Sequence, residues 1–95
     1  MTSIIYKKEL SLTPGRSIKI NFPYESEILS CQFKDNELCI WYKFRKEEIR
    51  ISRREFIIYG TDWEIDIDED YYKLNHISTL QIDGYVWHIF EILSK

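Results

Sequence analysis

Two dipeptides, Asp35-Asn36 and Asp83-Gly84, constrain the fold of this chain more than any other feature of its sequence. Both consist of residues that tolerate the positive φ angles of two-residue hairpin turns, and both lie between runs rich in apolar, aromatic and β-branched residues. We therefore predict two β-hairpins, with strands at 27–34 and 37–44 and at 71–82 and 85–93.

The remaining segments also favour strands. Residues 17–22 alternate between apolar and polar side chains, and a Pro14-Gly15 turn separates them from a first strand at 4–10. Residues 48–59 form a further candidate strand with a solvated first half and a buried second half. The chain has no alanine, the best helix former, and 16% of its residues are aromatic. We predict an all-β fold, a small antiparallel sandwich or barrel of about six to seven strands.

The length of the chain bounds its organisation. Its 95 residues are too few to divide between two hydrophobic cores, so we expect a single β domain over residues 1–95. No apolar run reaches the ~20 residues of a membrane helix, and the N-terminus lacks the pattern of a signal peptide, so we expect no membrane association. Cys31 and Cys39 lie in apolar runs, where free, buried thiols are expected.

No metal, cofactor or catalytic centre is expected from the sequence. The candidate zinc ligands Cys31, Cys39, His76 and His88 lack the close paired spacing of structural zinc sites. There is no Gly-x-Ser-x-Gly elbow and no Gly-rich phosphate loop, and only two histidines could serve as general bases near neutral pH. We therefore predict a protein that is not an enzyme.

Charge is distributed unevenly along the chain. The net charge of -3 disfavours binding to duplex nucleic acid. Residues 43–54, here called the basic segment, carry six cations and two carboxylates, and arginines near aromatic rings suit phosphates and nucleobases. The same pattern is also typical of a solvated hairpin end, and arginines on alternate strand faces cannot all reach one ligand. Residues 62–70, here called the acidic loop, carry six carboxylates and no cation.

The final strand, residues 85–93, is apolar on both faces. This suits a central strand or one covered by a partner subunit, and we predict a homo-oligomer, either a dimer or a tetramer. The aromatic residues Trp41, Trp87 and Phe90 are typical of a core as well as of a ligand platform. His88 has the same two interpretations, as a hydrogen-bonded interior histidine or as a site residue.

Five short segments occur along the chain in an informative order: Ile5-Tyr6-Lys7, Glu27-Ile28-Leu29-Ser30, Leu38-Cys39-Ile40-Trp41, Phe56-Ile57-Ile58-Tyr59-Gly60-Thr61 and Val86-Trp87-His88-Ile89-Phe90-Glu91. Over nearly the whole chain they resemble a widespread family of short phage and prophage proteins, and the last segment is the most specific. Two positions depart from the family pattern, because Asp62 and Ser78 stand where the family usually has glycine.

The resemblance implies a phage counter-defence protein in the cytoplasm of an infected bacterial host. Such proteins include sponges for the cyclic nucleotide signals of CBASS immunity, so we expect a homo-oligomer that sequesters a cyclic dinucleotide without cleaving it. The predicted ligand contacts are Arg50, Arg53 or Arg54 for phosphates, Trp41, Tyr59 or Tyr6 for bases, and Thr61 and His88.

The arginines are expected to be exposed. Replacing Arg53 and Arg54 together should therefore weaken ligand binding and leave the fold intact. The alternative to a sponge is a protein–protein inhibitor of a host defence factor, in which the acidic loop meets a basic surface, or a virion-associated accessory module.

Overall fold

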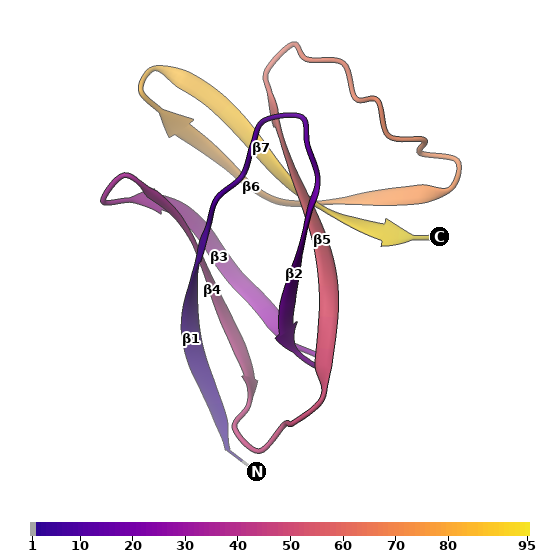
Figure 1. Cartoon of the computed structure of the whole chain (residues 1–95). Helices are drawn as coiled ribbons and strands as arrows, with labels where there is room; N and C mark the ends of the chain where they lie inside the picture. The colour runs from indigo at the N-terminus through magenta and orange to yellow at the C-terminus, as the bar shows by residue number, and fades with distance from the viewer. Residues whose placement is uncertain (1) are drawn as a thin grey trace.

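The computed structural model describes residues 2–95, which form an all-β structure (Figure 1). Its seven strands are β1 (Ser3–Leu10), β2 (Ile18–Pro23), β3 (Glu27–Lys34), β4 (Glu37–Arg45), β5 (Ile51–Gly60), β6 (Tyr72–Ile82) and β7 (Tyr85–Ser94). They form two antiparallel sheets, with strand orders β1-β4-β3 and β2-β5-β7-β6. The predicted all-β class is confirmed. No helix that could cross a membrane occurs among residues 2–95.

Both predicted hairpin turns are present. Asp35 and Asn36 have φ angles of 53° and 64°, and Asp83 and Gly84 have φ angles of 50° and 83°. Positive φ at both central residues is the geometry of a type I′ turn, whose twist matches that of the flanking strands. Each turn therefore fixes the register of its hairpin, which pairs β3 with β4 and β6 with β7.

One strand boundary differs from the prediction. We expected a strand from residue 48, but β5 begins at Ile51. The preceding residues form a turn in which the Glu48 amide donates to the Arg45 carbonyl at 2.9 Å. The Arg50 carbonyl accepts a hydrogen bond from the Tyr24 amide at 2.8 Å. These backbone hydrogen bonds delay the start of β5, and the alternation of side chains gives no sign of them.

Asp62 and Ser78, the two residues expected to depart from the resembled phage family, lie at a left-handed residue and beside a β-bulge. Asp62 has a φ of 69°, a left-handed conformation that glycine adopts without steric cost and aspartate tolerates. Ser78 follows a shift in the pairing of β6 with β7 between His76 and Ser78, the mark of a β-bulge. Only at Asp62 does the backbone favour glycine, because Ser78 has no positive φ and pairs with Ile89.

The core fills the space between the sheets. Its buried members come from both sheets: Leu10, Phe22, Cys31, Leu38, Ile40, Tyr42, Phe56, Ile58 and Ile89. Phe22 has no exposed surface, and its ring centroid lies 5.0 Å from that of Tyr42 and 5.7 Å from that of Phe56. Cys31 and Cys39 are buried free cysteines as predicted, and burial, with a smaller effect of Cys39, raises the pKa of Cys31 to about 12.

The final strand is central in its sheet. β7 pairs with β5 on one side and with β6 on the other. Of the two explanations for its apolar faces, a central strand or cover by a partner subunit, the structure shows the central strand. Ile89 is fully buried in the core, and Phe90 packs on the opposite face against Tyr59 and His76. The apolar pattern of β7 is thus explained within one subunit, and the homo-oligomer stays a prediction that needs other support.

Candidate binding site

The eight predicted ligand residues do not line one pocket within a subunit. Thr61 follows the end of β5 and lies beside His88, whereas Arg53 lies near the start of β5. Eight residues of extended chain span about 26 Å, so the two ends of β5 are well separated. Tyr6 and Trp41 belong to the other sheet.

Two threonines and two histidines form a hydrogen-bonded row across β6, β7 and the end of β5. Thr61 Oγ1 lies 2.8 Å from His88 Nε2, and His88 Nδ1 lies 3.0 Å from Thr79 Oγ1. Thr79 Oγ1 is also 2.8 Å from His76 Nε2. Hydroxyl groups both donate and accept, so each threonine can bridge its neighbours in either tautomer of the histidines. This arrangement is here called the Thr–His row.

A small hollow adjoins the Thr–His row at Thr61. It has a volume of about 230 Å³, and the side chains of Trp63, Tyr85 and Trp87 are among its walls. Trp63 reaches this position because residue 60 is a glycine. A Cβ atom at Gly60 would lie 2.7 Å from Trp63 Nε1, closer than real contacts allow. The aromatic rings of this hollow suit stacking of a flat ligand. Thr61 borders the hollow, while its hydroxyl bonds to His88 on the face of the sheet opposite Trp63 and Trp87.

Tyr59 is buried rather than available for stacking. Only 3% of its surface is exposed, and its hydroxyl donates a hydrogen bond to Asp66 Oδ1 at 2.9 Å. Burial and the bond to Asp66 raise the pKa of Tyr59 to about 12. Tyr59 therefore tethers the acidic loop to β5, and its ring cannot stack on a base while the loop is in place.

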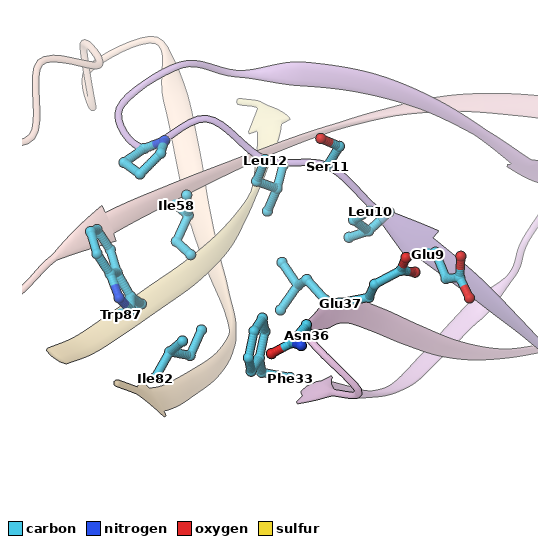
Figure 2. Close-up of a pocket in the computed structure, with 12 residues that line it drawn as sticks. Glu9, Leu10, Ser11, Leu12, Phe33, Asn36, Glu37, Ile58, Ile82 and Trp87 are labelled. Carbon is cyan, nitrogen blue, oxygen red and sulfur yellow. The ribbon is translucent and has the colours of Figure 1, made fainter. Parts of the chain in front are cut away.

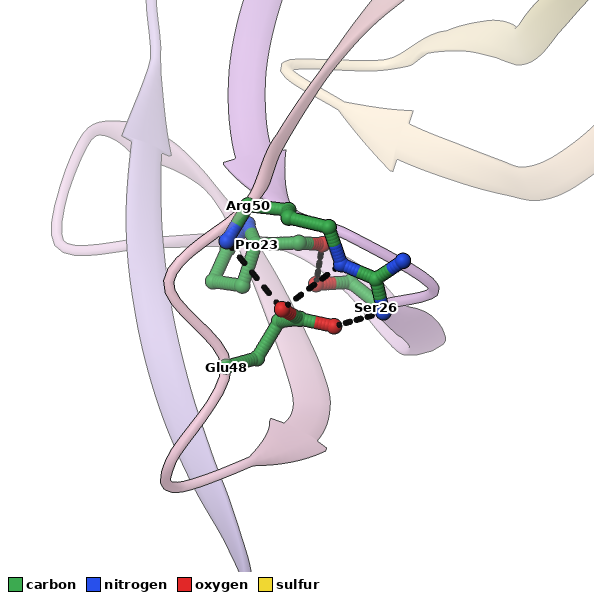
Figure 3. A network of polar contacts seen from close by, with 4 residues as sticks. All are labelled: Pro23, Ser26, Glu48 and Arg50. Carbon is green, nitrogen blue, oxygen red and sulfur yellow. Dashed lines mark hydrogen bonds and ion pairs between the residues drawn. The ribbon is translucent and has the colours of Figure 1, made fainter.

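Arg50 is held by neighbouring side chains of its own subunit (Figure 3). Its guanidinium forms two hydrogen bonds with Glu48, at 3.1 and 2.8 Å, and lies 4.3 Å from the centre of the Tyr24 ring. These side-chain bonds, together with bonds from the backbone, lower the pKa of Glu48 to about 2. Arg50 stays exposed, but Glu48 already neutralises its charge at neutral pH.

Arg54 is not the exposed cation that we expected. Its Nε and Nη2 donate to the two carboxylate oxygens of Glu91 at 2.6 and 2.7 Å, and its Nη1 donates to the Ser26 carbonyl at 2.6 Å. The side chains of Arg54 and Glu91 are only 20% and 4% exposed. This correction follows from the strand period, because Arg54 points to the same side of β5 as Phe56. Its removal should therefore disturb the fold.

The other predicted residues are more accessible. Arg53 is exposed on β5 opposite Asn21, and it borders a hollow of about 680 Å³ together with Lys19 and Tyr24. Trp41 is half-buried on the outer face of β4, beside a hollow of about 280 Å³. Tyr6 is 51% exposed on β1, and its ring packs edge-on against Phe44. Their ligand contacts remain predictions.

Sequence reasoning missed some members of the site. Thr79 was detectable, because counting back from the Asp83-Gly84 turn places it opposite His88. The contact of His76 with Thr79 depends on the β-bulge, and Trp63 was assigned only to the acidic loop. Among the described residues 2–95, no three His, Cys, Asp or Glu side chains gather to hold a metal ion.

The comparisons with known proteins identify a family and no function. No curated protein and no solved structure matches this chain. Residues 1–94 match the family described as "Domain of unknown function (DUF7352)". Since the match spans almost the entire sequence, the chain belongs to that family.

Proposed function

We propose that this protein sequesters a cyclic dinucleotide without cleaving it, as a phage counter-defence protein in the cytoplasm of the infected host. The observation that carries the proposal is the Thr–His row beside the aromatic hollow. The rings of Trp63 and Tyr85 suit stacking of a nucleobase, and Thr61 and His88 suit hydrogen bonds to a base edge or a phosphate oxygen. Sequestration requires binding alone, so no catalytic group is needed.

The phosphates of such a ligand call for cations that one subunit does not supply near Thr61. Arg53 and Lys19 are exposed, but they lie toward the opposite end of their strands. Two copies that pair in opposite directions would bring the basic segment of each against the aromatic hollow of the other. A homo-oligomer, most simply a dimer, is therefore part of the proposal.

Isothermal titration calorimetry with cyclic di-AMP, cyclic di-GMP and cyclic GMP-AMP tests the proposal. We expect one of these to bind and to be recovered intact after heat denaturation of the protein. Thr61→Val keeps the shape of the side chain and removes its hydroxyl, so it should weaken binding about tenfold or more. Thr2→Val makes the same change at an exposed residue near the N-terminus, outside the aromatic hollow, and should leave binding unchanged.

Arg53→Ala should also weaken binding. Mixing it with Thr61→Val shows whether the binding site is built by two subunits or by one. If the site is shared, a mixture of the Thr61→Val and Arg53→Ala proteins regains part of the tight binding, because mixed dimers contain one intact site. Absence of heat with every cyclic dinucleotide, or recovery of a linear product, would contradict the proposal.

The alternative, a protein–protein inhibitor, is favoured by one observation. Trp63 and the Tyr59–Asp66 bond hold the acidic loop against the sheet, while most of its carboxylates remain exposed. A fixed acidic surface suits a basic surface on another protein. Such an inhibitor would show no heat with any nucleotide alone, and it would bind its purified target with an affinity that falls steeply as salt is added.

A further inference from the structure

A hollow between the two sheets lies at the end of the molecule near both hairpin turns (Figure 2). This inter-sheet cleft has a volume of about 550 Å³, which is within the range of small-molecule sites. Its lining is mostly apolar and includes Leu12, Phe33, Leu38, Ile58, Ile82 and Trp87. Phe33 comes from one sheet and Trp87 from the other, so aromatic rings lie on both walls.

The charged groups of the inter-sheet cleft are two carboxylates, Glu9 and Glu37. Figure 2 shows their side chains next to each other beside Leu10. A hydrogen bond to Glu9 and repulsion between the two negative charges raise the pKa of Glu37. Lys7 lies 3.8 Å from Glu9, at the limit of an ion pair, and both side chains are about half exposed. Water screens such a pair. Lys34 lies opposite Glu37 in the pairing of β3 with β4, and it lines the adjoining hollow of about 280 Å³ together with Lys7 and both carboxylates.

We propose that the inter-sheet cleft binds a small organic cation, with its apolar body between the sheets and its ammonium group at Glu9 and Glu37. Adjacent carboxylates are each destabilised by the other, and a cation that joins them relieves this repulsion. Aromatic rings such as those of Phe33 and Trp87 also attract cations through their π faces. The same carboxylates would repel a cyclic dinucleotide, so the two sites take ligands of opposite charge, although Trp87 lines both hollows.

Three probes with one apolar body and different charges test the proposal. Phenylbutylamine, phenylbutanol and phenylbutyrate are cationic, neutral and anionic near pH 7. Titration of the full chain by calorimetry should show the amine binding at least about tenfold tighter than the carboxylate, with the alcohol between them. Glu9→Gln with Glu37→Gln should bring the three affinities within about threefold of each other.

A matched control removes the same amount of charge elsewhere. Glu25→Gln with Glu47→Gln changes two exposed carboxylates outside the cleft and should preserve the tenfold preference for the amine. Thr61→Val should leave the amine affinity unchanged while it weakens the cyclic dinucleotide, so the two proposals fail independently.

Two outcomes would overturn the cation site. One is no measurable binding of the amine to the unaltered protein. The other is an unchanged preference for the amine in the Glu9→Gln, Glu37→Gln protein, provided that its circular dichroism and unfolding midpoint show that it is folded. Both side chains are exposed, so we expect this variant to fold.

Discussion

The two ends of the space between the sheets differ in how a glutamate there is compensated. At one end Arg54 of β5 pairs with Glu91 of β7 and bonds to the Ser26 carbonyl, which joins the second sheet to the start of β3. At the other end the inter-sheet cleft stays open, and Glu9 and Glu37 stand at its edge. Hollows of about 340 and 680 Å³ border Arg54 and Glu91 too, so the ends differ in charge rather than in space. Each end contains glutamate, but only the end at Arg54, here called the closed end because the ion pair spans it, has a buried arginine as a partner.

This difference shows that burial and partners decide what a charged residue does. The basic segment contains six cations, yet Arg54 serves the fold and Arg50 is neutralised by Glu48. Conversely, Glu9 and Glu37 belong to no charge run in the sequence, and the pairing of β1 with β4 brings them together. Counting charges along the sequence thus overestimates the positive charge available to a ligand at the basic segment. It underestimates the negative charge that Glu9 and Glu37 present together.

The largest effect should come from breaking the closed end. Arg54→Met keeps most of the apolar volume of the side chain but leaves the buried Glu91 carboxylate without its partner. An uncompensated buried charge costs about 3 to 5 kcal/mol, so urea unfolding should show a loss of this size. Arg53→Met, one residue away on the exposed face, should change stability by less than about 0.5 kcal/mol.

A second variant distinguishes a charge effect from a packing effect. Replacing Arg54 by Met and Glu91 by Leu removes both charges, and this pair should regain most of the stability that Arg54→Met loses. Equal stability losses in the Arg53→Met and Arg54→Met proteins would mean that the ion pair does not close this end of the core.

The sequence predicted the fold well because its strongest signals are local. Two-residue hairpin turns need residues that accept positive φ. Asp35-Asn36 and Asp83-Gly84 are such pairs, and all four residues have positive φ. The alternating pattern places each side chain on one face of a strand but does not say which face is covered. The second half of β5 was predicted to be buried, and Tyr59 within it is buried. Its assignment as a base-stacking residue did not allow for the bond to Asp66, which fixes the acidic loop over it.

The candidate site was predicted only in part because its contacts cross strands that are distant in sequence. Thr61 and His88 were both named, and their 2.8 Å contact depends on the pairing of β5 with β7. Arg54 and Glu91 are joined by the same pairing, which no local pattern indicates. The strand pairing therefore determines these two contacts, which the spacing of residue types along the sequence does not indicate.

A moderate effect should come from truncation at the open end. Phe33 lines the inter-sheet cleft and is 38% exposed, so Phe33→Ala removes a ring that is already partly in water. We expect a loss of only about 1 kcal/mol in the free energy of unfolding, well below that of Arg54→Met. The affinity for phenylbutylamine should fall in the same variant. A loss as large as that at Arg54 would show that the open end is as tightly packed as the closed end.

The smallest effect should be a pH-dependent gain at the edge of the cleft. In the folded protein the contact with Glu9 raises the pKa of Glu37 above its usual value of 4.5, so folding favours the protonated form. The stability associated with this proton is present below about pH 4.5 and is lost as the pH rises through the folded-state pKa. Gln cannot ionise, and its amide can still donate to Glu9.

Glu37→Gln should therefore be slightly more stable than the unaltered protein near neutral pH and indistinguishable from it in acid. Urea midpoints measured from about pH 3.5 to 7 test this, with Glu47→Gln as an exposed control outside the cleft that should show no such trend. Addition of phenylbutylamine sharpens the comparison, because a bound cation should stabilise only the protein that retains both carboxylates. A lower midpoint for Glu37→Gln near neutral pH would show that the ionised pair stabilises the fold and needs no cation.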